Sequence, residues 1–145
     1  MQEFDFIGHQ GAAAVVPVTK EGKLVLVRQY RNALDRFTLE IPAGGLEDPE
    51  EPTIEAAARE LTEETGYVAG KIEFLISIFP TVAYDNEKID IYLATDLTMK
   101  ERHLDEDEYI NVEEWEVEDL EKLIYEGKIQ DGKTVAAVMA YKNRL

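Results

Sequence analysis

Several glutamates crowd into one short stretch of the chain, at a spacing that suits a metal ion. Glu60, Glu63 and Glu64 stand at i, i+3 and i+4, so a helix with 3.6 residues per turn places all three carboxylates on one face. Such like charges destabilise a helix by about a few tenths of a kcal/mol per pair, and by more where water is restricted. A hard divalent cation, which prefers oxygen ligands, would remove that cost.

One basic side chain stands within the acidic cluster. Arg59 directly precedes Glu60, and its guanidinium can hold Glu51 or Glu63 through charge-assisted hydrogen bonds. The simpler alternative is a solvated helix face, which is what most acidic clusters are. Charge and spacing alone leave both interpretations open.

The cluster lies in the strongest helix pattern of the sequence. Residues 52–65 are rich in Ala, Glu and Leu, with Pro52 suited to the first turn and Gly66 to the C-terminal cap. We expect Leu61 and Ile54 on this helix to face a sheet. Helical periodicity also predicts a helix around residues 120–124, ended by Gly127, and a last one over residues 133–141.

Strand patterns surround these helices, so both kinds of element are expected in one α/β fold. Residues 12–18 and 23–28 are expected to pair as a hairpin around the turn at residues 21–22. Further strands are predicted at residues 36–41, 72–79, 89–94 and 109–115. Pro42 and the glycines at 44 and 45 predict a loop before the acidic helix.

Composition limits the partners and the chemistry. The chain has 145 residues and a formal net charge of -16, which fits a single domain over residues 1–145 and opposes binding to nucleic acid or anionic lipid. An anionic substrate would be repelled unless divalent cations stood between its phosphates and the carboxylates. The absence of cysteine excludes disulfides, thiolate catalysis and cysteine-type zinc sites.

No segment of the sequence suggests export or a membrane partner. Residues 1–11 lack a basic segment followed by an apolar stretch, and no apolar run reaches the length of a membrane span. We therefore expect a soluble cytoplasmic protein. The two histidines, His9 and His103, show no metal-ligand spacing and are expected at the surface.

The stretch from Gly45 to Tyr67 resembles the Nudix box at all nine of its specified positions. The resemblance implies an α/β/α sandwich with a mixed sheet. It also implies a loop–helix–loop site that binds Mg²⁺, or Mn²⁺, and hydrolyses a nucleoside diphosphate linked to another moiety. By position, Gly45, or the adjacent Gly44, would provide the turn of the loop, and Arg59 would brace Glu51. The implied metal-site residues are Glu60, Glu63 and Glu64, with a backbone carbonyl at Ala43 or Gly44.

Flanking segments are similar to the ADP-ribose pyrophosphatase branch of that family. They are the run from Arg28 to Arg31 and the run from Leu39 to Gly44. Arg28 and Arg31 are candidate phosphate or ribose contacts, since a guanidinium offers paired donors to phosphate oxygens, and Glu40 is assigned to the substrate with them. The alternative for both arginines is a strand-end charge in solvent.

Two later loops hold the remaining candidates. The loop at residues 80–87 occupies the place of a substrate-recognition loop in this branch, with Tyr84 as a stacking partner and Glu87 as its acidic residue. The acidic run at residues 105–108 resembles a loop that supplies the catalytic base in relatives. Glu106 is the expected base and Glu108 an additional metal contact, whereas the alternative is a solvated loop.

These residues predict a Mg²⁺-dependent pyrophosphohydrolase that cleaves ADP-ribose to AMP and ribose 5-phosphate. The alternatives are hydrolysis of another nucleoside diphosphate sugar or of a dinucleoside polyphosphate, and a Nudix module that binds a nucleotide sugar without cleaving it. A homodimer is expected by analogy with the branch.

Overall fold

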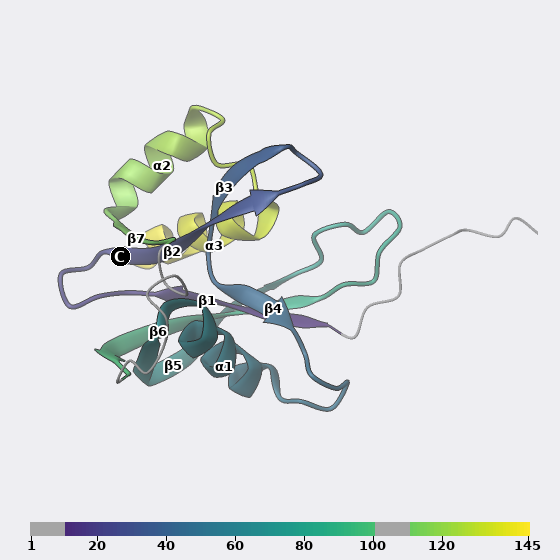
Figure 1. Ribbon diagram of the computed structural model, residues 1–145, viewed down its shortest axis with the longest axis horizontal. Coiled ribbons are helices and arrows are strands. Elements are labelled where there is room, and N and C mark those ends of the chain that lie inside the picture. The colour runs from purple at the N-terminus through teal and green to yellow at the C-terminus, as the bar shows by residue number, and fades with distance from the viewer. Residues whose placement is uncertain (1–10, 101–110) are drawn as a thin grey trace, which may run out of the picture.

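The computed structural model describes residues 11–100 and 111–145, which form strands and helices in the order shown in Figure 1. The strands are β1 (Ala12–Pro17), β2 (Leu24–Arg31), β3 (Arg36–Glu40), β4 (Ala43–Gly45), β5 (Tyr67–Ile78), β6 (Ile89–Met99) and β7 (Val112–Trp115). The helices are α1 (Thr53–Thr65), α2 (Val117–Tyr125) and α3 (Gly132–Asn143).

The larger sheet is mixed and has the strand order β4-β1-β6-β5. Strand β1 is parallel to β6, with Ala12 opposite Ile89, and antiparallel to β4, with Ala14 opposite Ala43. Every residue of β1 is buried, as expected of a strand covered on both faces. Three strands in the order β3-β2-β7 form a second, antiparallel sheet.

Helices cover both faces of the larger sheet, which gives the expected α/β/α sandwich (Figure 1). Alternate residues of β1 point to opposite faces. On one face, Ala13 and Val15 pack with Leu61 of α1. On the other, Ala14 and Val16 join a larger core that includes residues of α2, α3 and β2.

Helix α1 is fixed at both ends, and this sets the direction of its acidic face. At its start, the Thr53 hydroxyl donates a hydrogen bond to Asp90 of β6 at 2.8 Å. At its end, Gly66 adopts φ 83° and its N–H donates to the Thr62 carbonyl, so the chain turns directly into β5. The predicted helix and its glycine cap are confirmed.

The helices are short: 13 residues in α1, 9 in α2 and 12 in α3. Among residues 11–100 and 111–145, no helix has the length and apolar character needed to cross a membrane.

Two local predictions were wrong. The first two strands do not form a hairpin, because β1 pairs with β4 and β6 while β2 pairs with β3 and β7; only an isolated bridge joins Val18 to Leu24. The stretch expected as a loop after Pro42 contains the short strand β4. Strand β1 pairs with strands that are distant in sequence, and local patterns do not reveal such pairing. Strand β2 pairs instead with β3, the next strand along the chain, and with β7.

We predict that Leu61→Ala destabilises the fold by about 2–5 kcal/mol, because Leu61 is fully buried between α1 and the sheet. Ile54 on the same helix is 42% exposed, contrary to expectation, so Ile54→Ala is the matched control. Urea unfolding followed by circular dichroism measures both. Equal losses in the two variants would contradict this account of the α1 interface.

Candidate active site

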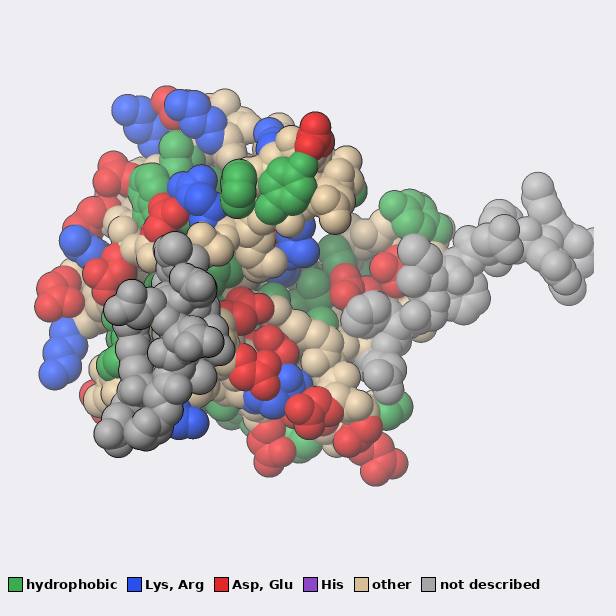
Figure 2. All heavy atoms as spheres, viewed as in Figure 1, with side chains coloured by type: hydrophobic (Ala, Val, Ile, Leu, Met, Phe, Trp, Pro, Cys, Tyr) green, Lys and Arg blue, Asp and Glu red, His purple; other side chains and the backbone are tan. Residues whose placement is uncertain are grey.

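The acidic face of α1 packs against β4, and acidic side chains gather over this region of the surface (Figure 2). Glu60 is 8% exposed, and its carboxylate lies so close to Gly44 that a Cβ there would be 2.2 Å from Glu60 Oε1. A side chain at this position would therefore displace the Glu60 carboxylate from where it lies. Gly44 and Gly45 both lie in β4 and neither has a positive φ, so the turn predicted at one of these two glycines is absent, and Gly44 is the one that the Glu60 carboxylate approaches.

Arg59 neutralises part of this charge and ties α1 to the segment before it. Its Nη2 donates to Glu51 Oε1 at 3.0 Å and to the Gly45 carbonyl at 3.3 Å, and its Nη1 donates to Glu60 Oε1 at 2.8 Å. The hydrogen bonds that Glu51 accepts from Arg59 and from the Glu47 backbone amide lower its pKa. Glu63 lies farther from the guanidinium, at 3.7 Å. The structure thus brings the predicted Arg59 and Glu51 together.

Glu64 is the carboxylate in this cluster whose ionised form is least favoured. Burial is the main cause that raises its pKa to about 7, and the charge of Glu60 adds to the effect. The backbone amide of Ala43 and the charge of Lys133 act in the opposite direction. Within the described residues, Glu64 Oε2 is buried and has no hydrogen-bond partner, which is costly for a polar atom.

These donors suit a divalent cation. Among the described residues, no three acidic or histidine side chains are already gathered into a metal-binding group. However, the unpartnered Glu64 oxygen and the Glu60 carboxylate beside Gly44 are hard oxygen donors of the kind that Mg²⁺ and Mn²⁺ prefer. Burial also raises the pKa of Glu60. The pKa of each group is thus raised even though Arg59 lies beside Glu60 and the charge of Lys133 acts on Glu64, and a bound cation would favour the ionised form of both.

A pocket of about 220 Å³ opens beside this face of α1 and contains one predicted substrate residue. Glu63 and Glu64 line it together with Arg28 of β2 and Asn111. The Arg28 guanidinium makes two hydrogen bonds with Glu113 of β7, from Nε at 2.5 Å and from Nη2 at 3.1 Å. Glu113 therefore orients Arg28 at the edge of the pocket, a partner that the sequence analysis missed.

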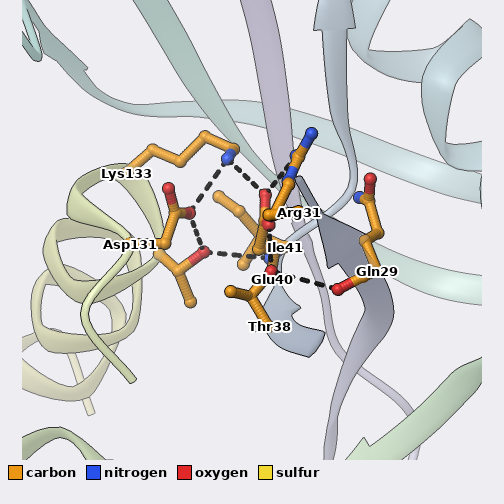
Figure 3. Close-up of polar contacts among 8 residues, drawn as sticks. Gln29, Arg31, Thr38, Glu40, Ile41, Asp131 and Lys133 are labelled. Atoms are coloured by element: carbon orange, nitrogen blue, oxygen red, sulfur yellow. Dashed lines mark hydrogen bonds and ion pairs between the residues drawn. The ribbon is translucent and has the colours of Figure 1, made fainter. Parts of the chain in front are cut away.

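Glu40 is the buried centre of a second ionic network, in which the Arg31 side chain remains 45% exposed (Figure 3). Glu40 is 2% exposed, and each of its oxygens accepts a hydrogen bond of 2.7 Å from Arg31. Its Oε1 also accepts from Lys133 Nζ at 2.8 Å, and Thr38 donates to its Oε2. Both oxygens of this predicted substrate residue are thus bonded within the protein. Arg31 and Glu40 line a second pocket, of about 370 Å³.

Helix α3 supplies the other half of this network. Lys133 also donates to Asp131 Oδ2 at 2.9 Å, and the buried Thr134 hydroxyl donates to the same oxygen at 2.6 Å. Burial by itself would lower the pKa of Lys133, but the carboxylates of Asp131 and Glu40 outweigh it and raise that pKa. Sequence reasoning missed these three residues, because helical periodicity marks a buried face but not a distant carboxylate.

The remaining candidates are not gathered at the α1 face. Tyr84 is 56% exposed in the loop between β5 and β6, and neither Tyr84 nor Glu87 lines the two pockets. Glu106 and Glu108 lie outside the described residues, as do both histidines. Their predicted roles stay predictions.

We predict that Glu40 gives the fold an acid-sensitive stability. Burial would raise its pKa, but the hydrogen bonds from Arg31, Lys133 and Thr38 together lower it from 4.5 to about 2. The resulting stabilisation is fully present above pH 4.5 and is lost as the pH falls towards 2. Between pH 7 and pH 3 the loss from this group is about 2 kcal/mol.

Urea unfolding at both pH values measures this loss for the unmodified protein, for Glu40→Gln and for Glu21→Gln, which removes an exposed carboxyl. The loss between pH 7 and pH 3 should be about 2 kcal/mol smaller in Glu40→Gln and unchanged in Glu21→Gln. The same acid loss in all three proteins would exclude this role of Glu40.

Comparison with known proteins identifies the family. The NUDIX domain model matches residues 8–138. The chain is 42% identical over 136 residues to an ADP-ribose pyrophosphatase of Bacillus subtilis (strain 168), covering 92% of this chain and 73% of that protein. It is 43% identical, over the same shares of both chains, to a methanol dehydrogenase activator of Bacillus methanolicus.

A solved structure agrees with these matches. The crystal structure of an ADP compounds hydrolase superimposes with a TM-score of 0.80 at 27% identity, covering 93% of this chain and 72% of that one. The fold, the acidic face of α1 and the residues that hold it therefore have one common explanation: the chain belongs to the Nudix family and is a Nudix hydrolase.

Proposed function

We propose that the protein is a Mg²⁺-dependent pyrophosphohydrolase that cleaves ADP-ribose to AMP and ribose 5-phosphate. The observation that carries this proposal is the α1 face, where Glu60 and the unpartnered Glu64 oxygen meet the backbone at Ala43 and Gly44. The similarity to the Bacillus subtilis ADP-ribose pyrophosphatase supports the choice of substrate.

The proposed reaction is a displacement at phosphorus. The oxygen of a water molecule bonds to one phosphorus of the substrate, the bond from that phosphorus to the bridging oxygen breaks, and the bridging oxygen leaves with the other phosphate. Glu106 is proposed to take the proton of that water. A divalent cation held by Glu60, Glu63, Glu64 and the Ala43 or Gly44 carbonyl, with Glu108 as a further contact, would neutralise phosphate charge and make water more acidic.

The described residues contribute positioning and charge. Arg59 fixes Glu51 and Glu60 relative to each other, and a hydrogen bond from the Ala43 backbone favours the ionised form of Glu64. Arg28, oriented by Glu113, places a cation at the pocket that Glu63 and Glu64 also line. That guanidinium is proposed to contact a phosphate or the ribose. Phosphoryl transfer requires little more from a protein than such placement and charge stabilisation.

The test is chromatographic identification of the products from ADP-ribose with and without Mg²⁺. AMP and ribose 5-phosphate are expected only with the metal. At saturating Mg²⁺, Glu64→Gln and Glu63→Gln should reduce turnover by about 100-fold or more, because both residues are proposed to hold the cation and changes in outer-shell groups alone cost about 10–100-fold. Glu55→Gln, an exposed charge on the same helix, should retain activity.

Several results would reject this function. Full turnover in both Glu63→Gln and Glu64→Gln would show that these carboxylates do not hold a catalytic metal ion. Cleavage of another nucleoside diphosphate sugar or of a dinucleoside polyphosphate in preference to ADP-ribose would select those substrates. Tight nucleotide binding without products would indicate a binding module.

We also propose that the protein is a homodimer, and exposed apolar side chains at the β2–β3 hairpin support a contact there. Tyr30 is 48% exposed, Leu34 56% and Phe37 59%, and the Tyr30 and Phe37 rings pack edge to face at 5.3 Å. An apolar surface of this kind is typical of an interface. Light scattering after size exclusion should give twice the chain mass, and Phe37→Glu should shift it towards the monomer. A monomeric mass for the unmodified protein would contradict the proposal.

A further inference from the structure

The ionic network between β3 and α3 contains a largely buried lysine that has no role in the proposed reaction. The side chain of Lys133 is 14% exposed, and its ammonium lies between Glu40 and Asp131 at 2.8 and 2.9 Å. Burying a charged group in this way is expensive, and ion pairs of this kind add little net stability compared with apolar packing. The arrangement therefore calls for a role other than stability alone.

The network ends on the backbone that leads to the metal-site segment. The Ile41 N–H donates to the Thr134 hydroxyl at 3.1 Å, and that hydroxyl donates to Asp131. Ile41 and Thr134 are both fully buried. Since Glu40 and Ile41 are consecutive, α3 holds a side chain of one and the backbone of the next, as Figure 3 shows.

The next two residues, Pro42 and Ala43, connect Ile41 to the active site. The Pro42 carbonyl accepts from the Val15 N–H at 3.0 Å, and Ala43 lies opposite Ala14 in the β1–β4 pair. The Ala43 amide then acts on Glu64 as a hydrogen-bond donor. Only Ile41 and Pro42 thus separate Glu40, held by α3, from Ala43, and the residue after Ala43, Gly44, lies against the Glu60 carboxylate.

We propose that Thr134, held in turn by Asp131, Lys133 and Glu40, is a positioning residue that fixes residues 41–43 so that the Ala43 backbone and Glu64 form a preorganised cation site. This inference depends on the proposed function for its metal site, but it concerns residues that lie outside the Nudix box. β1 holds the segment from one side through Val15 and Ala14, and Thr134 holds it from the other. Outer-shell groups of this kind set the geometry of the atoms that contact a metal.

The experiment measures Mn²⁺ affinity of the full chain by electron paramagnetic resonance, without substrate. Thr134→Val removes the hydroxyl and leaves the Ile41 N–H unpaired, and we expect the dissociation constant for Mn²⁺ to rise about tenfold. Thr134→Ser restores the hydroxyl and should return the constant to within about twofold of the original, a rescue that a purely packing role would not produce.

A matched control lies in the turn after β1. The Thr19 hydroxyl also accepts a backbone hydrogen bond, from the Lys23 N–H at 3.1 Å, so Thr19→Val makes the same chemical change away from α1. Its Mn²⁺ affinity should not change. Lys133→Met is the second variant if Thr134→Val does not fold, and it should also weaken Mn²⁺ binding about tenfold.

The outcomes separate this inference from the proposed activity. Thermal unfolding is measured on every variant, and a folded Thr134→Val or Lys133→Met protein with a lower melting temperature but unchanged Mn²⁺ affinity would overturn the inference. ADP-ribose turnover is assayed independently. If the unmodified protein binds Mn²⁺ tightly but does not cleave ADP-ribose, the proposed function is excluded. The Mn²⁺ affinities of the Thr134 and Lys133 variants would still test the positioning role. If the unmodified protein does not bind Mn²⁺, both the positioning role and the proposed function are excluded.

Discussion

Repulsion among carboxylates on one face of α1 is the constraint on which the site depends. Arg59 offsets part of it by holding Glu51 and Glu60, but it reaches Glu63 only at 3.7 Å. Glu64 is left partly buried with an unpartnered oxygen and a pKa of about 7. The fold holds this helix between Asp90 at one end and Gly66 at the other, so the repulsion cannot be relieved by moving the helix.

The surroundings of α1 supply fixed partners for charges that would otherwise move. Gly44 allows Glu60 to lie against the backbone of β4. Glu113 gives Arg28 a defined direction, and Asp131 with Glu40 does the same for Lys133. Arg28 and Lys133 are each held by two hydrogen bonds, which reduces the entropy that binding a ligand would have to remove.

The fold class and the acidic face of α1 could be predicted from the sequence, because both depend on short-range patterns. Helix spacing placed Glu60, Glu63 and Glu64 together, and the Gly66 cap fixed where the helix ends. Strand pairing was harder to predict from the sequence, so β4 and the partners of β2 were missed. The Lys133 network joins residues 93 positions apart, and no local signal connects a lysine in a last helix with a carboxylate at the end of β3.

The parallel pairing of β1 with β6 also has a consequence for how the chain acquires its structure. Ala12 pairs with Ile89, so the central strand of the larger sheet lacks one of its neighbours until most of the polypeptide has been synthesised. Contacts so distant in sequence slow the search for the native state. Because α1 packs on β1, β5 and β6, its complete docking surface exists only after that closure. Assembly of the hydrolytic centre is therefore expected to be a late event in folding.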